Sequence, residues 1–360
     1  MNNSFYLIDA MAFAFRAFHA ISATLTDSKG HPTNAVFGFT RILLKLLREH
    51  DPKYVTVVFD APGKNFRHEM YPEYKATRAK TAPELLEQIP RMYEVVEAMN
   101  LPLTIVPGVE ADDAIGTLAT QAVSQGHEVV IVSGDKDLLQ LVSGNVRVFD
   151  PGKEEEKAWT AAEQVRERFG VGPEHVRDAL ALSGDTADNI PGVRQGGEVK
   201  AAKLLSQYQT LENLYDTLQA ITGKLQEYLE TDREQAFFAR ELITIRTDVP
   251  MEVEVAKYER RPWDIKRISL CFKELAFHSL LRELESELPK KEIQQAYTLI
   301  NTPELLERLV RRLRTAGLFA IDTETTHIQP MLADLVGISV CMEPGSAYYI
   351  PVRQAGEDLE

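Results

Sequence analysis

The chain has 360 residues, 54 acidic against 40 basic side chains, and a formal net charge of −14. Its length exceeds one typical domain, and 44% hydrophobic residues can fill two or three cores. No apolar run is long enough to cross a bilayer, and the first residues lack the pattern of a signal peptide. With only Cys271 and Cys341, neither a disulfide framework nor a thiolate metal site is expected. These features favour a cytoplasmic protein.

Four short apolar runs are each followed by acidic residues. The runs cover residues 5–8, 54–59, 103–106 and 129–132, with helical patterns near 10–19, 34–49, 84–99 and 110–123. Strands that alternate with helices predict an α/β fold whose mainly parallel central sheet is flanked by helices. The acids that follow the runs are Asp9, Asp60, Glu110, Asp112, Asp113, Asp135 and Asp137.

These seven carboxylates are expected to meet at one edge of the sheet, since ligands of such sheets bind outside the carboxyl ends of the strands. A single Asp there is an ordinary turn or capping residue. Seven acids at one edge would repel one another without a cation, so a divalent metal site is favoured over capping alone. Ligands that are all oxygens favour Mg²⁺ or Mn²⁺ over Zn²⁺.

Residues 61–82, called the basic segment below, follow Asp60 directly. Their cations outnumber their acids, and Tyr71 and Tyr74 are interleaved among them. Basic side chains suit phosphates and aromatic rings can stack on unpaired bases, so the segment is a candidate for gripping a nucleic-acid strand. The alternative is a solvated loop.

From Thr160 to about residue 245 the pattern is helical. Asp185 and Asp188 lie three residues apart and could face the same metal ion. Gly192, Gly196 and Gly197 form a turn before a helix that carries Lys200, and such a turn lets backbone N–H groups approach a phosphate. Alone, this pattern is a weak signal, because glycine between helices usually forms an ordinary turn.

The last part of the chain reads as a separate segment. Residues 289–295 suggest a linker, and residues 296–360 predict a helix near 305–313 and strands near 318–321, 335–340 and 348–352. Asp322 and Glu324 follow the first of these strands.

These motifs together resemble the 5′-nuclease domain of bacterial DNA polymerase I, a member of the flap-endonuclease family. The resemblance covers residues 5 to about 285, and residues 296–360 resemble the opening of the same polymerase's 3′–5′ exonuclease domain. The motifs are Leu7-Ile8-Asp9, Arg16-Ala17-Phe18-His19, Val58-Phe59-Asp60, Phe66-Arg67 through Tyr74-Lys75 and Arg78, Val109 to Asp113, Gly134-Asp135-Lys136-Asp137, and Gly184-Asp185 through Asp188 to Val193.

The resemblance implies a flap-endonuclease fold divided into a catalytic core, residues 1–170, and a helix-hairpin-helix subdomain, residues 171–288. It also implies two metal clusters. The first matches Asp9, Asp60, Glu110, Asp112 and Asp113, and the second matches Asp135, Asp137, Asp185 and Asp188.

In the same family the basic segment forms a helical arch near the 5′ strand. Lys75 and Arg78 match its catalytic basic pair, Tyr74 its stacking residue, and Arg16 and Arg67 its phosphate contacts. The glycine turn with Lys200 matches the hairpin that holds duplex phosphates, often with K⁺. Here that turn departs from the usual Gly-x-Gly pattern, and Arg194 and Lys200 are candidates to compensate.

The implied function is a structure-specific 5′ nuclease of DNA replication and repair. It would act as a monomer with two Mg²⁺ ions, or Mn²⁺ in their place, on DNA with 5′ flaps, nicks or RNA-DNA primer junctions. Asp322 and Glu324 match an incomplete second exonuclease site, so the tail is expected to have no exonuclease activity of its own. The alternatives are a non-catalytic flap-binding module and a ribonuclease built on a similar acidic sheet edge.

Overall fold

The computed structural model describes residues 4–287, 296–327 and 329–352. The chain divides into two compact units, residues 1–284 and 285–360, and each is described by itself. The linker predicted at 289–295 lies outside the described residues. The predicted catalytic core, residues 1–170, falls within the first unit, and the predicted helical subdomain, residues 171–288, does so as far as Leu284.

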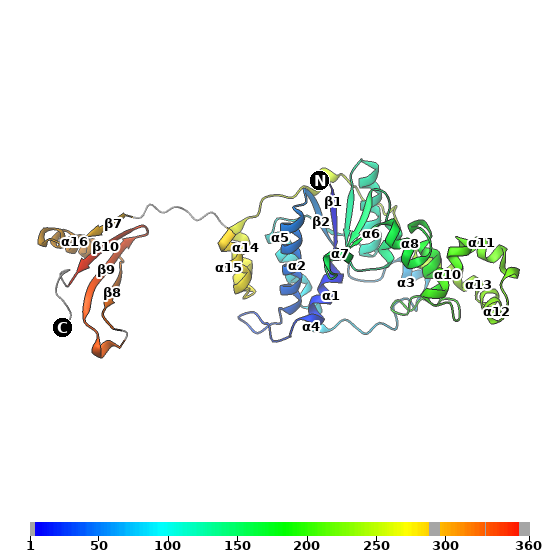
Figure 1. Cartoon of the computed structure of the whole chain (residues 1–360), viewed down its shortest axis with the longest axis horizontal. Helices are drawn as coiled ribbons and strands as arrows, with labels where there is room; N and C mark the ends of the chain where they lie inside the picture. The colour runs from blue at the N-terminus through cyan, green and yellow to red at the C-terminus, as the bar shows by residue number, and fades with distance from the viewer. Residues whose placement is uncertain (1–3, 288–295, 328, 353–360) are drawn as a thin grey trace. The chain divides into compact units, whose positions relative to one another are not determined.

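The first unit is built on a six-stranded sheet with the order β3-β2-β1-β4-β5-β6 (Figure 1). The first five strands pair in parallel and β6 pairs antiparallel to β5, which confirms the predicted α/β fold. Sequence reasoning missed β5 and β6. The strands are β1 (Phe5–Asp9), β2 (Tyr54–Phe59), β3 (Leu103–Ile105), β4 (Val129–Val132), β5 (Val146–Phe149) and β6 (Trp159–Thr160).

Both faces of this sheet are buried, as expected for parallel strands covered by helices. Along β1, Phe5 and Leu7 join one hydrophobic core, and Tyr6 and Ile8 join the other. The Tyr6 face is covered by α1 (Ala10–Ala20), α2 (Asn34–His50), α5 (Ile89–Ala98), α14 (Ile265–Glu274) and α15 (His278–Glu287). The Phe5 face is covered by α6 (Ala111–Ser124) and by the helical region described below.

The single helix predicted over 84–99 is two helices, α4 (Pro83–Leu86) and α5. The break lies at Gln88, whose buried side chain joins α4 to α2: its Nε2 donates to the carbonyl oxygen of Glu84 at 2.9 Å. Its Oε1 accepts hydrogen bonds from the backbone N–H groups of Ala35 and Val36, at 2.8 and 3.2 Å. Gln88 therefore satisfies free donors at the start of α2, which a periodicity argument could not anticipate.

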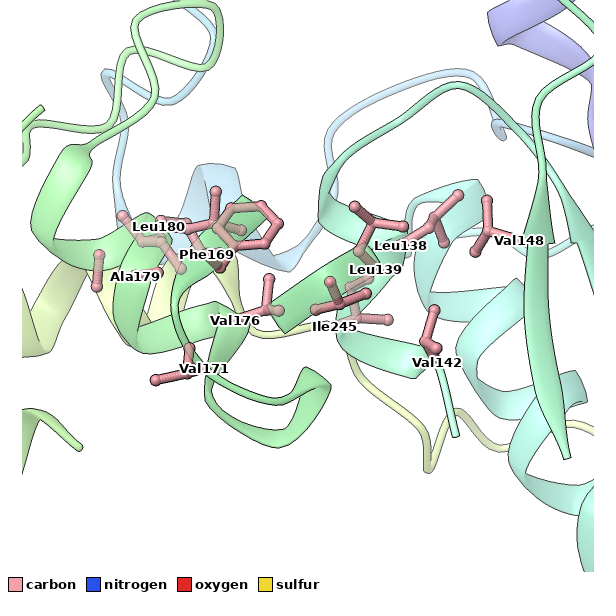
Figure 2. Packing of buried hydrophobic residues seen from close by; sticks show 14 of the residues in the cluster. Leu138, Leu139, Val142, Val148, Phe169, Val171, Val176, Ala179, Leu180 and Ile245 are labelled. Atoms are coloured by element: carbon pink, nitrogen blue, oxygen red, sulfur yellow. The ribbon is translucent and has the colours of Figure 1, made fainter. Parts of the chain in front are cut away.

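The helical pattern predicted from Thr160 is present as six helices. They are α8 (Ala162–Phe169), α9 (Val176–Ser183), α10 (Glu198–Tyr208), α11 (Leu211–Asp216), α12 (Lys224–Thr231) and α13 (Arg233–Ile243). Figure 2 shows that their apolar side chains continue the core of the sheet, from Val148 through Leu138 and Ile245 to Leu180. One continuous core thus holds the helical region against the sheet.

The second unit has a four-stranded sheet with the order β7-β10-β9-β8 and one long helix. Its elements are β7 (Ala296–Leu299), α16 (Pro303–Thr315), β8 (Ala320–Thr325), β9 (Leu335–Glu343) and β10 (Ser346–Pro351). No helix in the described parts of either unit is both long and apolar enough to span a membrane.

Candidate metal and active site

The parallel strands of the first sheet deliver acidic side chains into one cavity of about 610 Å³. β1 ends at Asp9, Asp60 follows β2 directly, and Glu110 precedes the first turn of α6. Their common direction brings the carboxyl ends of the strands to one edge. Eight of the nine predicted metal ligands line the cavity, namely Asp9, Asp60, Glu110, Asp112, Asp135, Asp137, Asp185 and Asp188.

Asp113 is the ninth, and it is turned away from the cavity. Its fully buried carboxylate accepts two hydrogen bonds from Arg67, at 2.6 and 2.8 Å, and a third from the backbone N–H of Arg246. Arg67 is 3% exposed and also donates to the carbonyl oxygens of Leu242 and Thr244. In this structure the Asp113 carboxylate therefore faces Arg67 and not the cavity, and the Arg67 guanidinium is engaged within the protein. Metal binding by Asp113 and phosphate contact by Arg67 stay predictions.

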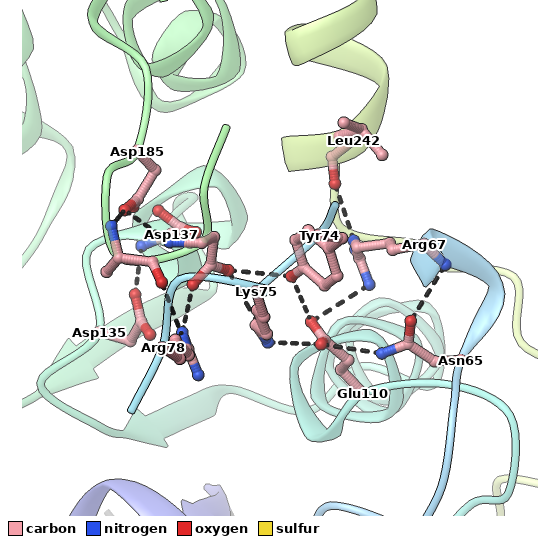
Figure 3. A network of polar contacts seen from close by, with 12 residues as sticks. Asn65, Arg67, Tyr74, Lys75, Arg78, Glu110, Asp135, Asp137, Asp185 and Leu242 are labelled. Atoms are coloured by element: carbon pink, nitrogen blue, oxygen red, sulfur yellow. Dashed lines mark hydrogen bonds and ion pairs between the residues drawn. The ribbon is translucent and has the colours of Figure 1, made fainter. Parts of the chain in front are cut away.

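The predicted catalytic pair lies at the wall of the cavity (Figure 3). The Lys75 ammonium forms an ion pair with Glu110, and the Arg78 guanidinium forms one with Asp188. Lys75 has a positive φ of 58°, and its backbone N–H donates to the carbonyl oxygen of Asp188 at 2.9 Å. The basic segment is thus fastened to the acidic residues by its own cations.

Tyr74 lies between the same two carboxylates. Its hydroxyl is 3.0 Å from Glu110 Oε2 and 2.9 Å from Asp188 Oδ2, and its ring is only 4% exposed. Burial and the two adjacent carboxylates raise the pKa of the phenol, so the hydroxyl keeps its proton and donates it to one acceptor at a time. Because Tyr74 is buried in this arrangement, stacking of its ring on a base stays a prediction.

Crowding raises the proton affinity of several of these carboxyl groups. Burial raises the pKa of Asp137 to about 8, with repulsion from Asp135 and Asp185 adding to it. Burial likewise raises the pKa of Asp9 to about 6, although Ser133 Oγ donates a hydrogen bond to it at 2.7 Å. For Asp112 the pKa is raised well above the usual range, by burial and then by its acidic neighbours. The opposite holds for Glu110, whose pKa is lowered because Lys75 and Arg67 outweigh burial.

The donor set fits divalent cations. Every acidic side chain that lines the cavity offers oxygen, and Asp137 Oδ1 is buried with no hydrogen-bond partner among the described residues. In the described parts of the chain, no three acidic, His or Cys side chains already stand in a ligating arrangement. Glu110, Asp185 and Asp188 are ion-paired with basic side chains instead.

Three contacts to these carboxylates escaped sequence reasoning. Besides the bond from Ser133 to Asp9, Lys136 Nζ lies 3.0 Å from Asp185 Oδ2, and Asn65 Nδ2 donates to Glu110 Oε1 at 2.8 Å. The only sequence feature that could have indicated the contact of Lys136 is its place between two acids in the motif Gly134-Asp135-Lys136-Asp137. No sequence feature indicated the contacts of Ser133 and Asn65.

Arg16, a predicted phosphate contact, does not line the acidic cavity. Its guanidinium pairs with Asp150 at 2.9 Å, and the residue lines a second cavity between α1, α2 and α15. Lys200 is exposed on α10. Both side chains are accessible in part, but neither lies beside the carboxylates.

The glycines of the hairpin, formed by α9, residues 184–197 and α10, differ in what they contact. A Cβ on Gly192 would lie 2.3 Å from the backbone nitrogen of Gly184, and one on Gly196 would lie 2.5 Å from the Leu182 carbonyl oxygen. Gly197 would meet no atom of the described residues within 4 Å. Close packing within the hairpin therefore accounts for the first two glycines without any DNA.

Three further predicted residues do not line the acidic cavity. Arg194, expected to compensate for the altered turn, is bound through its side chain and backbone N–H to Asp232. Asp322 and Glu324 lie on β8 of the second unit, a strand exposed along its whole length.

Three family models match the chain. They are described as the N-terminal resolvase-like domain of 5′-3′ exonuclease, residues 4–170, the C-terminal SAM fold of 5′-3′ exonuclease, residues 171–266, and a 3′-5′ exonuclease, residues 297–360. The first two together span well over half of the chain.

Relatives named DNA polymerase I match over nearly the whole chain. The protein of Chloroflexus aurantiacus is 39% identical and that of Bacillus subtilis 38%, over 98% and 96% of this chain. These matches cover 42% and 39% of the relatives, so the chain spans about two fifths of their length.

Solved structures share the fold of the first unit. The zinc-bound 5′-exonuclease of phage T5 matches with a TM-score of 0.57 at 18% identity, covering 79% of this chain and 98% of that one. The catalytic core of Rad2 in complex with DNA matches with a TM-score of 0.55 at 15% identity, covering 79% and 91%. The chain belongs to the 5′-3′ exonuclease family, since both domain models of that family match it in succession, and it is similar to bacterial DNA polymerase I over nearly its whole length.

Proposed function

We propose that this chain is a metal-dependent, structure-specific 5′ nuclease that hydrolyses DNA phosphodiesters at 5′ flaps, nicks and RNA-DNA primer junctions. The observation that carries the proposal is the single cavity lined by eight carboxylates, with Lys75 and Arg78 at its wall. Family membership and metal-bound relatives of the same fold support it.

Two groups of carboxylates would hold the divalent ions, which we propose to be Mg²⁺ with Mn²⁺ as a substitute. The first group is Asp9, Asp60, Glu110 and Asp112, and the second is Asp135, Asp137, Asp185 and Asp188. When bound, the ions would supply an activated water and stabilise charge on the scissile phosphate. Asp113 supports the first group from behind, since its carboxylate accepts a hydrogen bond from the backbone N–H of Glu110 at 3.1 Å.

Lys75 and Arg78 would stabilise the phosphate as negative charge develops on it. Both side chains now neutralise Glu110 and Asp188. Bound ions would take over that neutralisation and free both cations to face the scissile phosphate. The Tyr74 hydroxyl would continue to donate a hydrogen bond to Glu110 or Asp188, to whichever carboxylate still has a free lone pair.

The helical region would hold duplex DNA through phosphates and without reading its sequence, since phosphate contacts position a protein on DNA but carry no sequence information directly. A K⁺ ion at the hairpin has weaker support, because the Gly192 carbonyl oxygen already accepts a hydrogen bond from Gln235 at 2.6 Å. We further propose a monomer that works in the cytoplasm on the DNA of the nucleoid.

The decisive experiment is cleavage of a 5′-labelled double-flap DNA with Mg²⁺. The wild-type chain is compared with Asp112→Asn, with an EDTA control, and with Asp216→Asn, an exposed residue of α11 outside the cavity. We expect a short labelled product from the wild type and from Asp216→Asn, and none from Asp112→Asn or in EDTA.

The alternatives would give different results in the same assay. A chain that binds the flap but cuts it with neither Mg²⁺ nor Mn²⁺ would be a non-catalytic binding module. A chain that degrades single-stranded RNA and spares the flap would be a ribonuclease.

A further inference from the structure

The loop of residues 185–190, called the acidic loop below, carries two of the proposed metal ligands and is closed on itself. The backbone N–H of Asp185 donates to the carbonyl oxygen of Ile190 at 2.8 Å, and that of Ile190 donates back to Asp185 at 2.7 Å. Inside this bridge, Asp185 Oδ1 accepts hydrogen bonds from the backbone N–H groups of Ala187 and Asp188. The acidic loop is therefore a firm support for the carboxylates that it carries.

The basic segment is fastened to this loop through its main chain. The backbone N–H of Lys75 donates to the carbonyl oxygen of Asp188 at 2.9 Å. Two residues earlier, the carbonyl oxygen of Glu73 accepts a hydrogen bond from Asn189 Nδ2 at 2.8 Å. The two bonds together fix a short stretch of main chain on both sides of Tyr74.

Other contacts between the two stretches use side chains that the proposed reaction needs elsewhere. Lys75 and Arg78 are ion-paired with carboxylates of the cavity (Figure 3). Ions bound at these carboxylates would release both cations, as proposed above. The bonds that do not involve the two cationic groups must then keep the segment in place. The Asn189 amide supplies one of them, and it can be removed without touching a carboxylate.

Asparagine combines two properties that position 189 uses. The backbone of Asn189 has a φ of 56°, in the left-handed region, which asparagine adopts more readily than most residues with a side chain. Its amide also carries N–H donors for a carbonyl oxygen. Glycine would supply only the first property, and aspartate would place acceptor oxygens where a donor is needed. Asn189 itself does not line the acidic cavity, so its amide acts on the cavity through the main chain of the basic segment.

We propose that Asn189 is a positioning residue of the nuclease reaction. Its amide holds the main chain at Glu73, so that Lys75 and Arg78 stay beside the scissile phosphate after metal ions have displaced them from the carboxylates. This inference rests on the proposed function and deepens it, because it names what places the catalytic pair. It also links the pair to the hairpin, since Asn189 lies between α9 and α10, in the region that would hold duplex DNA.

The test compares the full chain with two variants of Asn189. Asn189→Gly adopts the positive φ without strain and removes the amide, and Asn189→Asp keeps the size of the side chain but can only accept hydrogen bonds. The matched control is Asn100→Gly. Asn100 has a φ of 58°, and its Nδ2 donates to the carbonyl oxygen of Pro262 at 3.1 Å, away from the residues that line the cavity. Thermal melting shows that each variant is folded at the assay temperature.

The first measurement needs neither metal nor DNA. Trypsin cuts after Lys and Arg, so brief digestion in EDTA followed by mass spectrometry reports how often Lys75 and Arg78 leave their places. Losing a hydrogen bond of ordinary strength should make local opening about fivefold more frequent. We therefore expect both Asn189 variants to be cut there about fivefold faster than the wild type and Asn100→Gly, with cutting after the exposed Lys29 as the internal standard. Equal rates at Lys75 and Arg78 in all proteins would overturn the proposal.

The second measurement is single-turnover cleavage of the double-flap DNA at saturating Mg²⁺. A misplaced catalytic pair should slow both Asn189 variants about tenfold or more, whereas Asn100→Gly should stay within about twofold of the wild type. Because Asn189 acts through the pair, adding Asn189→Gly to Lys75→Ala/Arg78→Ala should not reduce the residual cleavage, followed over hours, any further. A further loss of about tenfold in that background would overturn the proposal, since Asn189 would then act on the site by another route. If no protein cuts the flap, the wild type included, the proposed function fails, and the trypsin rates still decide whether Asn189 holds the segment.

Discussion

Replacing Arg67 tests whether this residue supports the site or contacts DNA. In the structure its guanidinium donates two hydrogen bonds to Asp113 and one each to the carbonyl oxygens of Leu242 and Thr244. It thereby joins the basic segment, the first turn of α6 and the end of the helical region. Arg67→Ala would leave a fully buried carboxylate, the carbonyl group of buried Leu242 and that of half-buried Thr244 without these partners.

The expected cost follows from that geometry. Removing one partner of a buried ion pair destabilises by about 3–5 kcal/mol, because the remaining charge stays buried without compensation. Asp113 retains backbone N–H donors from Glu110 and Arg246, which argues for the middle of that range. At roughly 2–4 °C per kcal/mol for a unit of this size, the melting temperature should fall by about 10 °C.

The assay is thermal unfolding by circular dichroism together with flap cleavage at a temperature where both proteins are folded. Arg78→Ala is the matched control, because its partly exposed guanidinium should contribute at most about 1 kcal/mol to stability. We expect Arg67→Ala to melt early and Arg78→Ala to melt normally but cleave slowly. The double replacement Arg67→Met/Asp113→Leu should recover most of the lost stability, since both charges are then gone.

One result would refute this reasoning. If Arg67→Ala melted like the wild type and bound DNA more weakly, the guanidinium would be a phosphate contact, as the family resemblance implies. The buried pair would then make no net contribution to the fold.

Three further predictions follow from the same contacts. The raised pKa of Asp137, about 8 against 3.8 for the free side chain, means that the folded chain binds this proton more tightly than the unfolded chain. The protonated Asp137 therefore contributes its full stabilisation below about pH 4, and this contribution is lost as the pH rises through 8. In EDTA the melting temperature should accordingly fall between pH 6 and 8.5, and added Mg²⁺ should reduce that fall. Tyr74→Phe removes a hydroxyl that donates to a carboxylate and should cost about 1.5 kcal/mol in urea unfolding, with cleavage retained at saturating Mg²⁺. Gly192→Ala should cost about 2 kcal/mol because its Cβ would meet the backbone of Gly184, whereas Gly197→Ala should be within about 0.5 kcal/mol of wild type; equal effects would contradict the packing account.

The sheet and the acids at its edge could be predicted because both depend on local pattern. Each apolar run is long enough to form a buried strand, and parallel strands bring their carboxyl ends to one edge whatever lies elsewhere in the chain. β5 and β6 were missed because they are short and Arg147 interrupts the apolar pattern. The break at Gln88 had one local signal, Pro90 in the first turn of α5, which has no backbone N–H to continue a single helix. The bonds from Gln88 to the start of α2 had none, since that partner lies more than fifty residues away.

Asp112 and Asp113 show that the sequence pattern does not determine which of two neighbouring acids faces the cavity. The two are neighbours in the first turn of α6, and each has the charge and the position of a metal ligand. Successive helix residues point about 100° apart, so one carboxylate faces the cavity and the other faces the core. Asp113 is the one that faces the core because its ion-pair partner, Arg67, is buried there, and Arg67 lies 46 positions earlier in the chain. The sequence shows both charges without showing that they meet.

The same cations that should act on the phosphate also decide how the site behaves without metal. Glu110 and Asp188 cannot give their oxygens fully to divalent ions while Lys75 and Arg78 hold them. Conversely, divalent ions held by these carboxylates would release both cations inside the cavity, where a DNA phosphate would be their counter-ion. Metal binding and DNA binding should therefore favour each other, with Lys75 and Arg78 as the link. Measured Mg²⁺ affinity should rise when flap DNA is present, and the Lys75→Ala/Arg78→Ala variant should bind Mg²⁺ more tightly than the wild type in the absence of DNA while losing most of that rise.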